Sequence, residues 1–325
     1  MIRVLLAAAS TLTLATGVAQ AQDSFPVTIE HALGTTTIET KPERVVTWGW
    51  SAQDVAIGLG VIPVGMPFFN YGGGSDGLLP WTEAALQERG LATPTILPDT
   101  AEPPLEAIAA LQPDVIIAPY SGLTPEEYAL LSNIAPVVAY PETAWLIRWQ
   151  EAVRLTGRAL GLSEDAEALV AETEAFLAKE AAAYPEIEGK VFANVVNRTD
   201  GQVAVRTEGD PRVQLFTDIG MIAAPETEGG VLVPTGISYT LSYENFDRIP
   251  AEMLISFFND AQSADSFFAL DLIAMSPLVA KGAYTRFEGE EITMAVSGAV
   301  TPLSLRWGFP QVIEGVGAAA NAAAQ

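Results

Sequence analysis

Hydrophobic and polar positions in the first half of the chain follow two alternating patterns. Short apolar runs of strand length recur, and segments with helical spacing of apolar residues separate them. The expected strands are 44–48, 61–65, 115–118 and 137–140, and the expected helices are 51–59, 81–89, 105–111 and 125–132. Alternation of this kind is typical of a parallel sheet with helical crossovers. The first half therefore predicts an α/β lobe.

One short pattern from this lobe recurs in the second half of the chain. A glutamate, Glu106 or Glu244, opens a short helical stretch that ends in a proline, and an acidic residue eight positions later leads into an apolar strand. The recurrence predicts two lobes of similar build. Ligand sites form preferentially at domain interfaces, so a cleft between the lobes is the expected site.

The joint between the lobes is expected in segment 143–161, which contains no proline and ends at Gly161. A helix of that length spans about 27 Å and limits hinge motion between the lobes. Strands of the second lobe are expected at 191–197, 253–258 and 291–296. The predicted fold class is α/β, with two lobes of mainly parallel sheets, one long connecting helix and a ligand cleft between the lobes. The predicted division is a signal peptide at 1–21, an N-terminal lobe at 22–142, the connecting helix at 143–161 and a C-terminal lobe at 162–325.

The N-terminus has the pattern of a secretory signal. Arg3 precedes an apolar run from Val4 to Val18, and Ala19-Gln20-Ala21 matches a small-x-small cleavage site. The mature chain is expected to begin at Gln22 in the periplasm. Cysteine is absent, which excludes disulfides and a lipid-modified N-terminal cysteine, so a lipoprotein is not expected.

The composition of the chain disfavours several classes of binding partner. The chain has 16 basic and 40 acidic residues, which disfavours nucleic acid and anionic membranes as partners and mainly favours solubility. One histidine and no cysteine argue against direct capture of zinc or manganese.

Several segments, in this order, resemble the periplasmic iron-siderophore binding proteins, the class with a helical backbone that also includes the vitamin B12 binder. The matching segments are Lys41-Pro42-Glu43-Arg44-Val45-Val46, 56–65, 102–117 and Leu155-Thr156-Gly157-Arg158-Ala159-Leu160-Gly161. The resemblance implies a monomeric substrate-binding protein that captures a ferric siderophore and delivers it to the permease dimer of an inner-membrane ABC importer. It implies no cofactor, because iron enters only within the ligand. Ferric citrate, haem and cobalamin stay open as other bulky ligands.

A ferric siderophore arrives with its iron already six-coordinate, so the protein must bind the organic shell. Aromatic side chains supply contact area, and guanidinium groups donate to the chelating oxygens. Catecholates are expected to need several arginines and hydroxamates to use aromatic walls, and the sequence offers both sets. Candidate residues lie in loops after strands. They are Trp48, Trp50, Tyr71, Tyr120 and Ser121 in the first lobe, and Arg198, Arg206, Arg212, Tyr239 and Phe258, with Asn259 at the rim, in the second.

Several candidates also suit a structural role that involves no ligand. Trp48 at a strand end also suits core packing, and each arginine also suits a surface ion pair in a very acidic protein. Trp145 and Trp149, four residues apart, are expected to pack one face of the connecting helix.

Glu106 and Glu244 have a different expected role. The resemblance implies that one exposed glutamate on each lobe docks into arginine pockets of the permease, with Glu102 as a second choice in the first lobe. The alternative is a pair of favourable first-turn helix carboxylates.

A secreted enzyme is the competing class. Gly49-Trp50-Ser51-Ala52-Gln53 lies between a strand and a helix as a hydrolase nucleophile does, but glutamine replaces the final glycine of that motif. His31 lies upstream, against the usual order of that fold. Abundant carboxylates leave a glycosidase open without supporting one. The sequence therefore predicts a binding protein and no enzyme.

Overall fold

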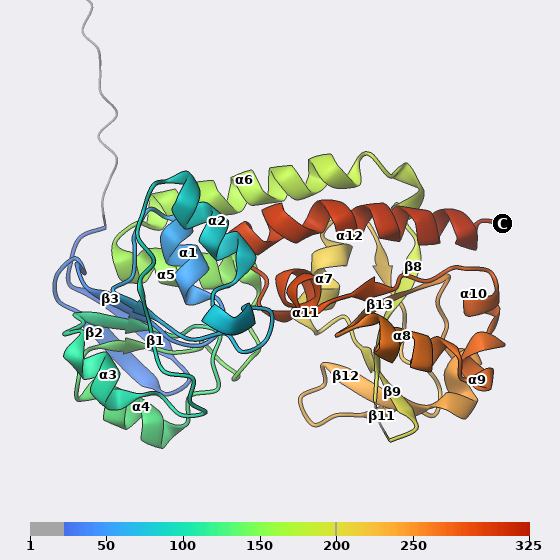
Figure 1. Ribbon diagram of the computed structural model, residues 1–325, viewed down its shortest axis with the longest axis horizontal. Helices are drawn as coiled ribbons and strands as arrows, with labels where there is room; N and C mark the ends of the chain where they lie inside the picture. Colours follow the sequence, from blue (N-terminus) through green and yellow to red (C-terminus); the bar gives the residue numbers. More distant parts are fainter. Residues whose placement is uncertain (1–22, 199) are drawn as a thin grey trace, which may run out of the picture.

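The computed structural model describes residues 23–198 and 200–325, so the expected signal peptide lies outside the described residues. Two α/β lobes lie side by side, and two long helices run across both of them on one side (Figure 1). No helix of the described ranges is both long and apolar enough to cross a membrane. The predicted fold class is confirmed.

The N-terminal lobe is built on a five-stranded parallel sheet in the order β5-β4-β3-β6-β7. Its strands are β3 (Val45–Thr47), β4 (Gly65–Met66), β5 (Thr95–Ile96), β6 (Val115–Ile117) and β7 (Val137–Val138). Its helices are α1 (Ala52–Gly58), α2 (Pro80–Glu88), α3 (Leu105–Ala110) and α4 (Pro125–Ser132), and a hairpin of β1 (Val27–His31) and β2 (Gly34–Ile38) precedes them. Apolar strand residues are buried on both faces, as covered parallel sheets require. The alternating pattern predicted the α/β build of this lobe, although the strand expected at 61–65 forms only at Gly65–Met66 and β5 was not expected.

The C-terminal lobe has a mixed seven-stranded sheet in the order β11-β12-β9-β8-β13-β14, with β10 also paired to β8. Its strands are β8 (Val191–Asn197), β9 (Gln202–Arg206), β10 (Ile222–Ala223), β11 (Val231–Leu232), β12 (Ser238–Ser242), β13 (Met253–Phe258) and β14 (Phe287–Glu288). Its short helices are α7 (Pro211–Thr217), α8 (Ala261–Phe268), α9 (Asp271–Ala274), α10 (Pro277–Ala280) and α11 (Glu290–Thr293). The parallel pair β8 and β13 confirms two predicted strands.

The expected strand at 291–296 is wrong. This segment is helical, formed by α11 and a π-helical turn at Met294–Gly298. Ile292 and Met294–Val296 are buried, and an apolar run this short has no periodicity that separates strand from helix. Its side chains pack instead against α12 (Pro302–Ala323), where Gly308 leaves room for Ala295 and Val296.

The helix that joins the lobes is also not the expected one. Helix α5 (Trp149–Leu160) begins six residues later than 143 and packs on α1 and β1 within the N-terminal lobe. The 19-residue helix α6 (Ser163–Ala181) instead spans both lobes, and α12 lies along it (Figure 1). Gly161 does end α5 in the left-handed conformation, as predicted. Gly157 then lets α6 fold back closely, because a Cβ there would lie 2.3 Å from the Ala166 Cβ.

A buried carboxylate ties the lobes together where α1 meets α12. Asp54 accepts hydrogen bonds from Trp81 Nε1 at 2.7 Å, Thr82 Oγ1 at 2.5 Å and Thr301 Oγ1 at 3.0 Å. Thr301 is the N-cap of α12, so one carboxylate links three elements. Burial raises the pKa of Asp54, although the three hydrogen bonds act in the opposite direction.

Candidate functional site

Three aromatic side chains gather on the N-terminal lobe where it faces its partner lobe. Trp50, Tyr120 and Trp145 lie in the loops after β3, β6 and β7, with ring centroids 5.5 to 6.4 Å apart in edge-on arrangements. Trp50 is 37% exposed and Trp145 is 43% exposed, large fractions for indoles. We call these three residues the aromatic wall.

Glycines allow the loops of the aromatic wall to approach one another. The Trp50 amide donates to Tyr120 O at 3.0 Å, and Gly49 beside it has a φ of +84°. A Cβ on Gly49 would lie 2.4 Å from Tyr120 O, so another residue would push the two loops apart. Gly49, the first position of the elbow-like motif, therefore serves the packing of the aromatic wall.

Trp145 was expected on a helix, and the structure corrects this. It lies in the loop before α5 with a φ of +60°, and its amide donates to Ser121 O at 3.1 Å. Its place after the predicted strand 137–140 was the signal that could have identified it. Trp149 does lie on α5 and is buried, as expected.

The C-terminal lobe faces the aromatic wall with two arginines held by one carboxylate. Arg212, in the first turn of α7, donates to Asp210 through Nε at 2.7 Å and Nη2 at 2.6 Å. Arg206, at the end of β9, lies 3.6 Å from Asp210 and donates through Nη1 to Asn194 Oδ1 at 3.0 Å and Ser297 Oγ at 2.8 Å. We call Arg206, Asp210 and Arg212 the arginine pair with its carboxylate. Two of the three expected cleft arginines thus come together.

Both guanidinium groups are charged at neutral pH: burial acts to lower the pKa of each, but Asp210 opposes it and the pKa of Arg212 is raised. Burial, followed by the nearby Arg212, lowers the pKa of Arg206 to about 10, and Asp210 opposes that change. Arg206 is therefore still protonated at neutral pH. Asn194 and Ser297, which hold Arg206, had no signal in the sequence.

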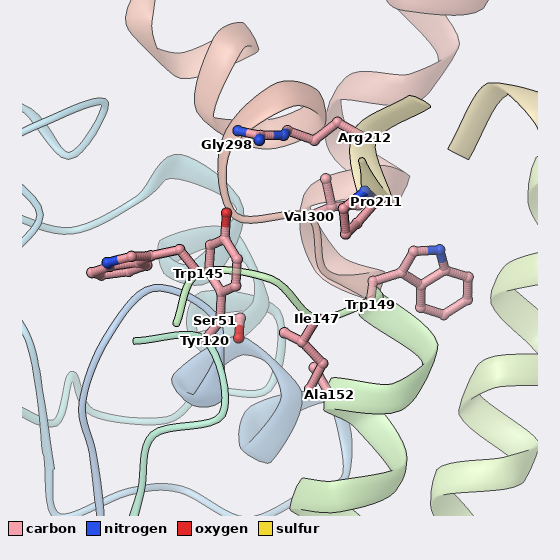
Figure 2. Close-up of a pocket in the computed structure, with 10 residues that line it drawn as sticks. All are labelled: Ser51, Tyr120, Trp145, Ile147, Trp149, Ala152, Pro211, Arg212, Gly298 and Val300. Atoms are coloured by element: carbon pink, nitrogen blue, oxygen red, sulfur yellow. The ribbon is translucent and has the colours of Figure 1, made fainter. Parts of the chain in front are cut away.

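Tyr120 is the residue of the aromatic wall that meets the arginine pair. Its phenol points toward the Arg212 guanidinium (Figure 2), and both residues line one small cavity of about 20 Å³. That space holds about one water molecule, so the lobes nearly touch here. Burial raises the pKa of Tyr120, with Arg212 acting against the change, so the phenol is neutral and can donate a hydrogen bond at pH 7.

Three candidate residues do not face the cleft. Tyr239 and Phe258 are buried in the second core of the C-terminal lobe, and Tyr239 Oη pairs with Thr227 Oγ1 at 2.8 Å. Ser121 is buried and donates to Ala118 O at 2.8 Å. Alternate strand residues point to opposite faces, and the sequence did not say which face of β12 and β13 is covered.

Three further candidates have mixed outcomes. Trp48 is half-buried, packs in the N-terminal core and also lines a groove beside Trp50. Tyr71 Oη donates to Asn259 Oδ1 at 2.8 Å, so these two residues meet across the lobes. Arg198 is exposed and ion-paired with Asp200 in the turn between β8 and β9. The structure therefore shows Arg198 in the alternative role, that of a surface ion pair.

Glu106 and Glu244 occupy equivalent exposed positions. Glu106 lies in the first turn of α3, and Glu244 lies in the first turn of the 3-10 helix Tyr243–Arg248. α3 and α9, against which that 3-10 helix packs, lie on the side of the molecule away from α6 and α12 (Figure 1). Within residues 23–198 and 200–325, neither glutamate forms an ion pair.

The geometry required of a serine hydrolase is missing from the described residues. His31 Nε2 pairs with Thr36 Oγ1 at 3.0 Å, and Nδ1 accepts from the Leu33 amide at 3.3 Å. The Ser51 hydroxyl is buried without a hydrogen-bond partner among the described residues and is not paired with His31, the single histidine of the sequence. Across the described part of the chain, no three His, Asp or Glu side chains are grouped to hold a metal ion.

Sequence comparisons identify relatives of this chain. Residues 75–285 match the family model described as periplasmic binding protein. The chain is 36% identical over 116 residues to the Fe(3+) dicitrate-binding periplasmic protein FecB of Escherichia coli, which covers 35% of either chain. It is 33% identical over 129 residues to the achromobactin-binding periplasmic protein of Dickeya dadantii, covering 37% of this chain and 35% of the relative. These alignments span about a third of the curated relatives.

A comparison of structures extends over nearly the whole chain. The crystal structure of PiaA from Streptococcus pneumoniae in complex with ferrichrome superposes with a TM-score of 0.80 at 31% identity. The match covers 91% of this chain and 99% of that protein.

Proposed function

The chain belongs to the periplasmic binding protein family, and we propose that it captures a ferric siderophore between its lobes and delivers it to an ABC permease of the inner membrane. The observation that carries the proposal is the pairing of the aromatic wall of one lobe with the arginine pair of the other. A solved relative of the same fold has ferrichrome bound.

The two walls have the chemistry that a saturated iron chelate needs. A ferric siderophore presents oxygens with partial or full negative charge and apolar organic arms. Arg206 and Arg212 supply charge-assisted donors, Tyr120 adds a neutral donor, and Trp50 and Trp145 supply apolar area. None of these groups needs to replace an iron ligand, so the chelate binds intact.

The test is a titration of the mature apo protein, followed by intrinsic fluorescence. Six tryptophans, two of them in the aromatic wall, make quenching a sensitive readout. The titrants are a ferric catecholate, a ferric hydroxamate, ferric citrate, haem and cobalamin, with iron-free chelators as controls. We expect saturable quenching at submicromolar concentration by a ferric siderophore. No response to any of the five would overturn the proposal.

Ferric citrate is the second candidate ligand, because the chain resembles a ferric dicitrate-binding protein over 116 residues. Small carboxylate chelates use less aromatic area than bulky siderophores do. Tighter binding of ferric citrate than of both siderophores in the same titration would favour this alternative. Turnover of any titrant would instead favour an enzyme, and we expect none.

Docking to the permease is assigned to Glu106 and Glu244. Equivalent exposed carboxylates on two similar lobes suit two symmetric permease subunits, and such charges steer and align the complex. The variant Glu106→Ala/Glu244→Ala is expected to bind ligand as the wild type does and to lose uptake in cells. Asp247→Ala, on the same 3-10 helix as Glu244, is the control and should transport normally.

Two outcomes would change this assignment. Loss of uptake by Glu102→Ala and not by Glu106→Ala would move the first docking residue to Glu102. Loss of ligand affinity in the Glu106→Ala/Glu244→Ala variant would place these carboxylates in the cleft instead.

The cellular location and assembly complete the proposal. The mature protein is expected as a periplasmic monomer that starts at Gln22 and carries no lipid. Mass spectrometry of the protein from a periplasmic extract tests the cleavage site, and size-exclusion chromatography with light scattering tests the monomer.

A further inference from the structure

The groove beside Trp48 and Trp50 lies next to the cleft on the N-terminal lobe. It encloses about 300 Å³, and its walls include the rings of Trp48, Trp50, Phe68 and Trp145. We call it the side groove. Trp145 lines both the side groove and the small cavity at Tyr120 and Arg212, so one indole borders both spaces. A ligand that contacts the arginine pair can therefore extend into the side groove.

The charged side chains that line the side groove are acidic, whereas the arginine pair of the C-terminal lobe is basic. Asp99 and Glu127 line it, and its lining contains no lysine or arginine. Asp99 is exposed and forms no hydrogen bond or ion pair within the described ranges. Glu127 is half-buried, and its Oε2 accepts from the Thr124 amide at 2.8 Å. Neither carboxylate is neutralised by a neighbouring cation of the described chain.

Indole rings together with carboxylates favour a cation. The face of an indole attracts an ammonium group through its quadrupole, and a carboxylate adds Coulomb attraction that strengthens as water is excluded. An anionic group in the same groove would be repelled. Although Trp50 and Trp145 pack on each other and on Tyr120, both indoles keep large exposed surfaces. A methylene chain ending in an ammonium group would cover both indoles and reach the carboxylates.

We propose that the side groove binds a protonated amine on an arm of the ferric chelate, while the iron centre of that chelate lies against Arg206 and Arg212. The inference rests on the proposed function and deepens it. The preferred ligand is then dipolar, with an electron-rich chelate centre at one end and an ammonium group at the other. A chelate that is anionic throughout would fit only one of the two charged surfaces.

The experiment compares two chelates that share one iron centre. Ferric desferrioxamine B is a linear trihydroxamate that ends in a primary amine, and its N-acetyl derivative has the same centre without the charge. We expect the amine form to bind about tenfold more tightly, a difference of about 1.4 kcal/mol. Added salt should shrink this difference, because it screens the partly exposed carboxylates.

Matched variants locate the effect. Asp99→Asn/Glu127→Gln is expected to reduce the preference for the amine form below twofold and to leave affinity for the acetylated form unchanged. Glutamine at position 127 still caps α4, so the fold should persist. Glu126→Gln removes an exposed charge from the same turn, outside the groove lining, and should keep the full preference. Equal loss in Glu126→Gln would mean that the net charge of the acidic protein acts, and not the groove.

The remaining outcomes separate this inference from the proposed function. Equal affinity for both chelates in the wild type would overturn the side groove and leave siderophore capture standing. If neither trihydroxamate binds, the groove is tested with butylammonium against butanol, read from the indole N–H resonances of Trp48, Trp50 and Trp145. Ammonium-specific shifts that vanish in Asp99→Asn/Glu127→Gln would support the groove, and no shift would overturn it.

Discussion

The two lobes contribute opposite kinds of surface to the same cleft. The N-terminal lobe presents aromatic rings that stand partly in solvent, whereas the guanidinium side chains of the C-terminal lobe are only 14% and 22% exposed. The proposed ligand would gain apolar contact by covering the rings. It would gain strong hydrogen bonds from arginines whose desolvation was already offset in folding, because Asp210 and its neighbours hold them in place.

The C-terminal lobe keeps positive charge at the cleft although the protein as a whole is very acidic. Asp210 balances one of the two positive charges, so the pair retains a net charge of about +1 by simple counting. Exposed arginines such as Arg198 are instead paired with surface carboxylates. Under the proposed function, the partly buried pair would offer a ligand positive charge in a protein that is acidic as a whole.

The largest expected effect concerns Asp54 and its three hydrogen-bond donors, which link the lobes where α1 meets α12 and which we call the seam. Asp54→Ala leaves Trp81, Thr82 and Thr301 without their shared acceptor and should lower the free energy of unfolding by about 3 kcal/mol or more. Urea denaturation measures this loss. A change below about 1 kcal/mol, the size of a typical net hydrogen bond, would mean that Asp54 does not hold the seam.

The pH dependence of this seam has a definite sign. Burial raises the pKa of Asp54 in the folded state, so the folded protein binds a proton more tightly than the unfolded chain does. The contribution of this proton to stability is complete below the unfolded pKa of about 3.9 and is lost as pH rises through the folded pKa. The stability advantage of the wild type over Asp54→Asn should therefore be larger at pH 4 than at pH 7. An advantage that grows with pH would contradict the raised pKa.

The next largest effect is expected from removing one member of the arginine pair. Arg212→Ala is expected to weaken a ferric siderophore about a hundredfold, or about 2.8 kcal/mol, because it removes a charged donor and leaves Asp210 less balanced. Arg212→Lys keeps the charge without the fork and should lose less. Arg198→Ala is the matched control, with less than a twofold change, and fluorescence titration measures all three. An equal loss in Arg198→Ala would mean that the ligand lies over the β8–β9 turn.

A smaller effect is expected from the aromatic wall. Trp145→Ala should weaken binding about tenfold, or about 1.4 kcal/mol, because the ligand loses an apolar surface that solvent already reaches. Trp145→Phe should restore most of the affinity. Calorimetry can compare the affinities of Trp145→Ala and Arg212→Ala. A greater loss in Trp145→Ala would mean that the aromatic wall, and not the arginine pair, supplies most of the binding free energy.

The smallest effect is expected where the lobes touch at the cleft rim. Tyr71→Phe removes the hydrogen bond to Asn259 and keeps the ring, so affinity should fall about threefold, or about 0.7 kcal/mol. Unfolding and binding are measured on the same variant. A loss above tenfold in affinity with unchanged stability would mean that the Tyr71 hydroxyl contacts the ligand and not only Asn259.

Sequence patterns predicted most elements with clear periodicity. Strands β3, β6 and β7 of the N-terminal lobe and the parallel strands β8 and β13 lie where apolar runs placed them, whereas β4 overlaps the expected strand 61–65 only at Gly65 and β5 was not predicted. Patterns failed for segment 291–296, in which Ile292 and Met294–Val296 are buried, and for the start of α5, where Trp145 leaves helical geometry. Tertiary contacts decided both cases, because a short apolar run is compatible with either structure.

Within the site, the sequence alone determined the chemical inventory: aromatic residues after strands, few arginines, a single histidine and no cysteine. Tertiary structure decided which of these residues meet. It turned Tyr239 and Phe258 into the core, moved Trp145 into the aromatic wall and brought Arg206 to Arg212 around Asp210. The physical reason is that the facing direction of a side chain depends on which face of its element is covered, and segments far apart in the sequence supply that cover.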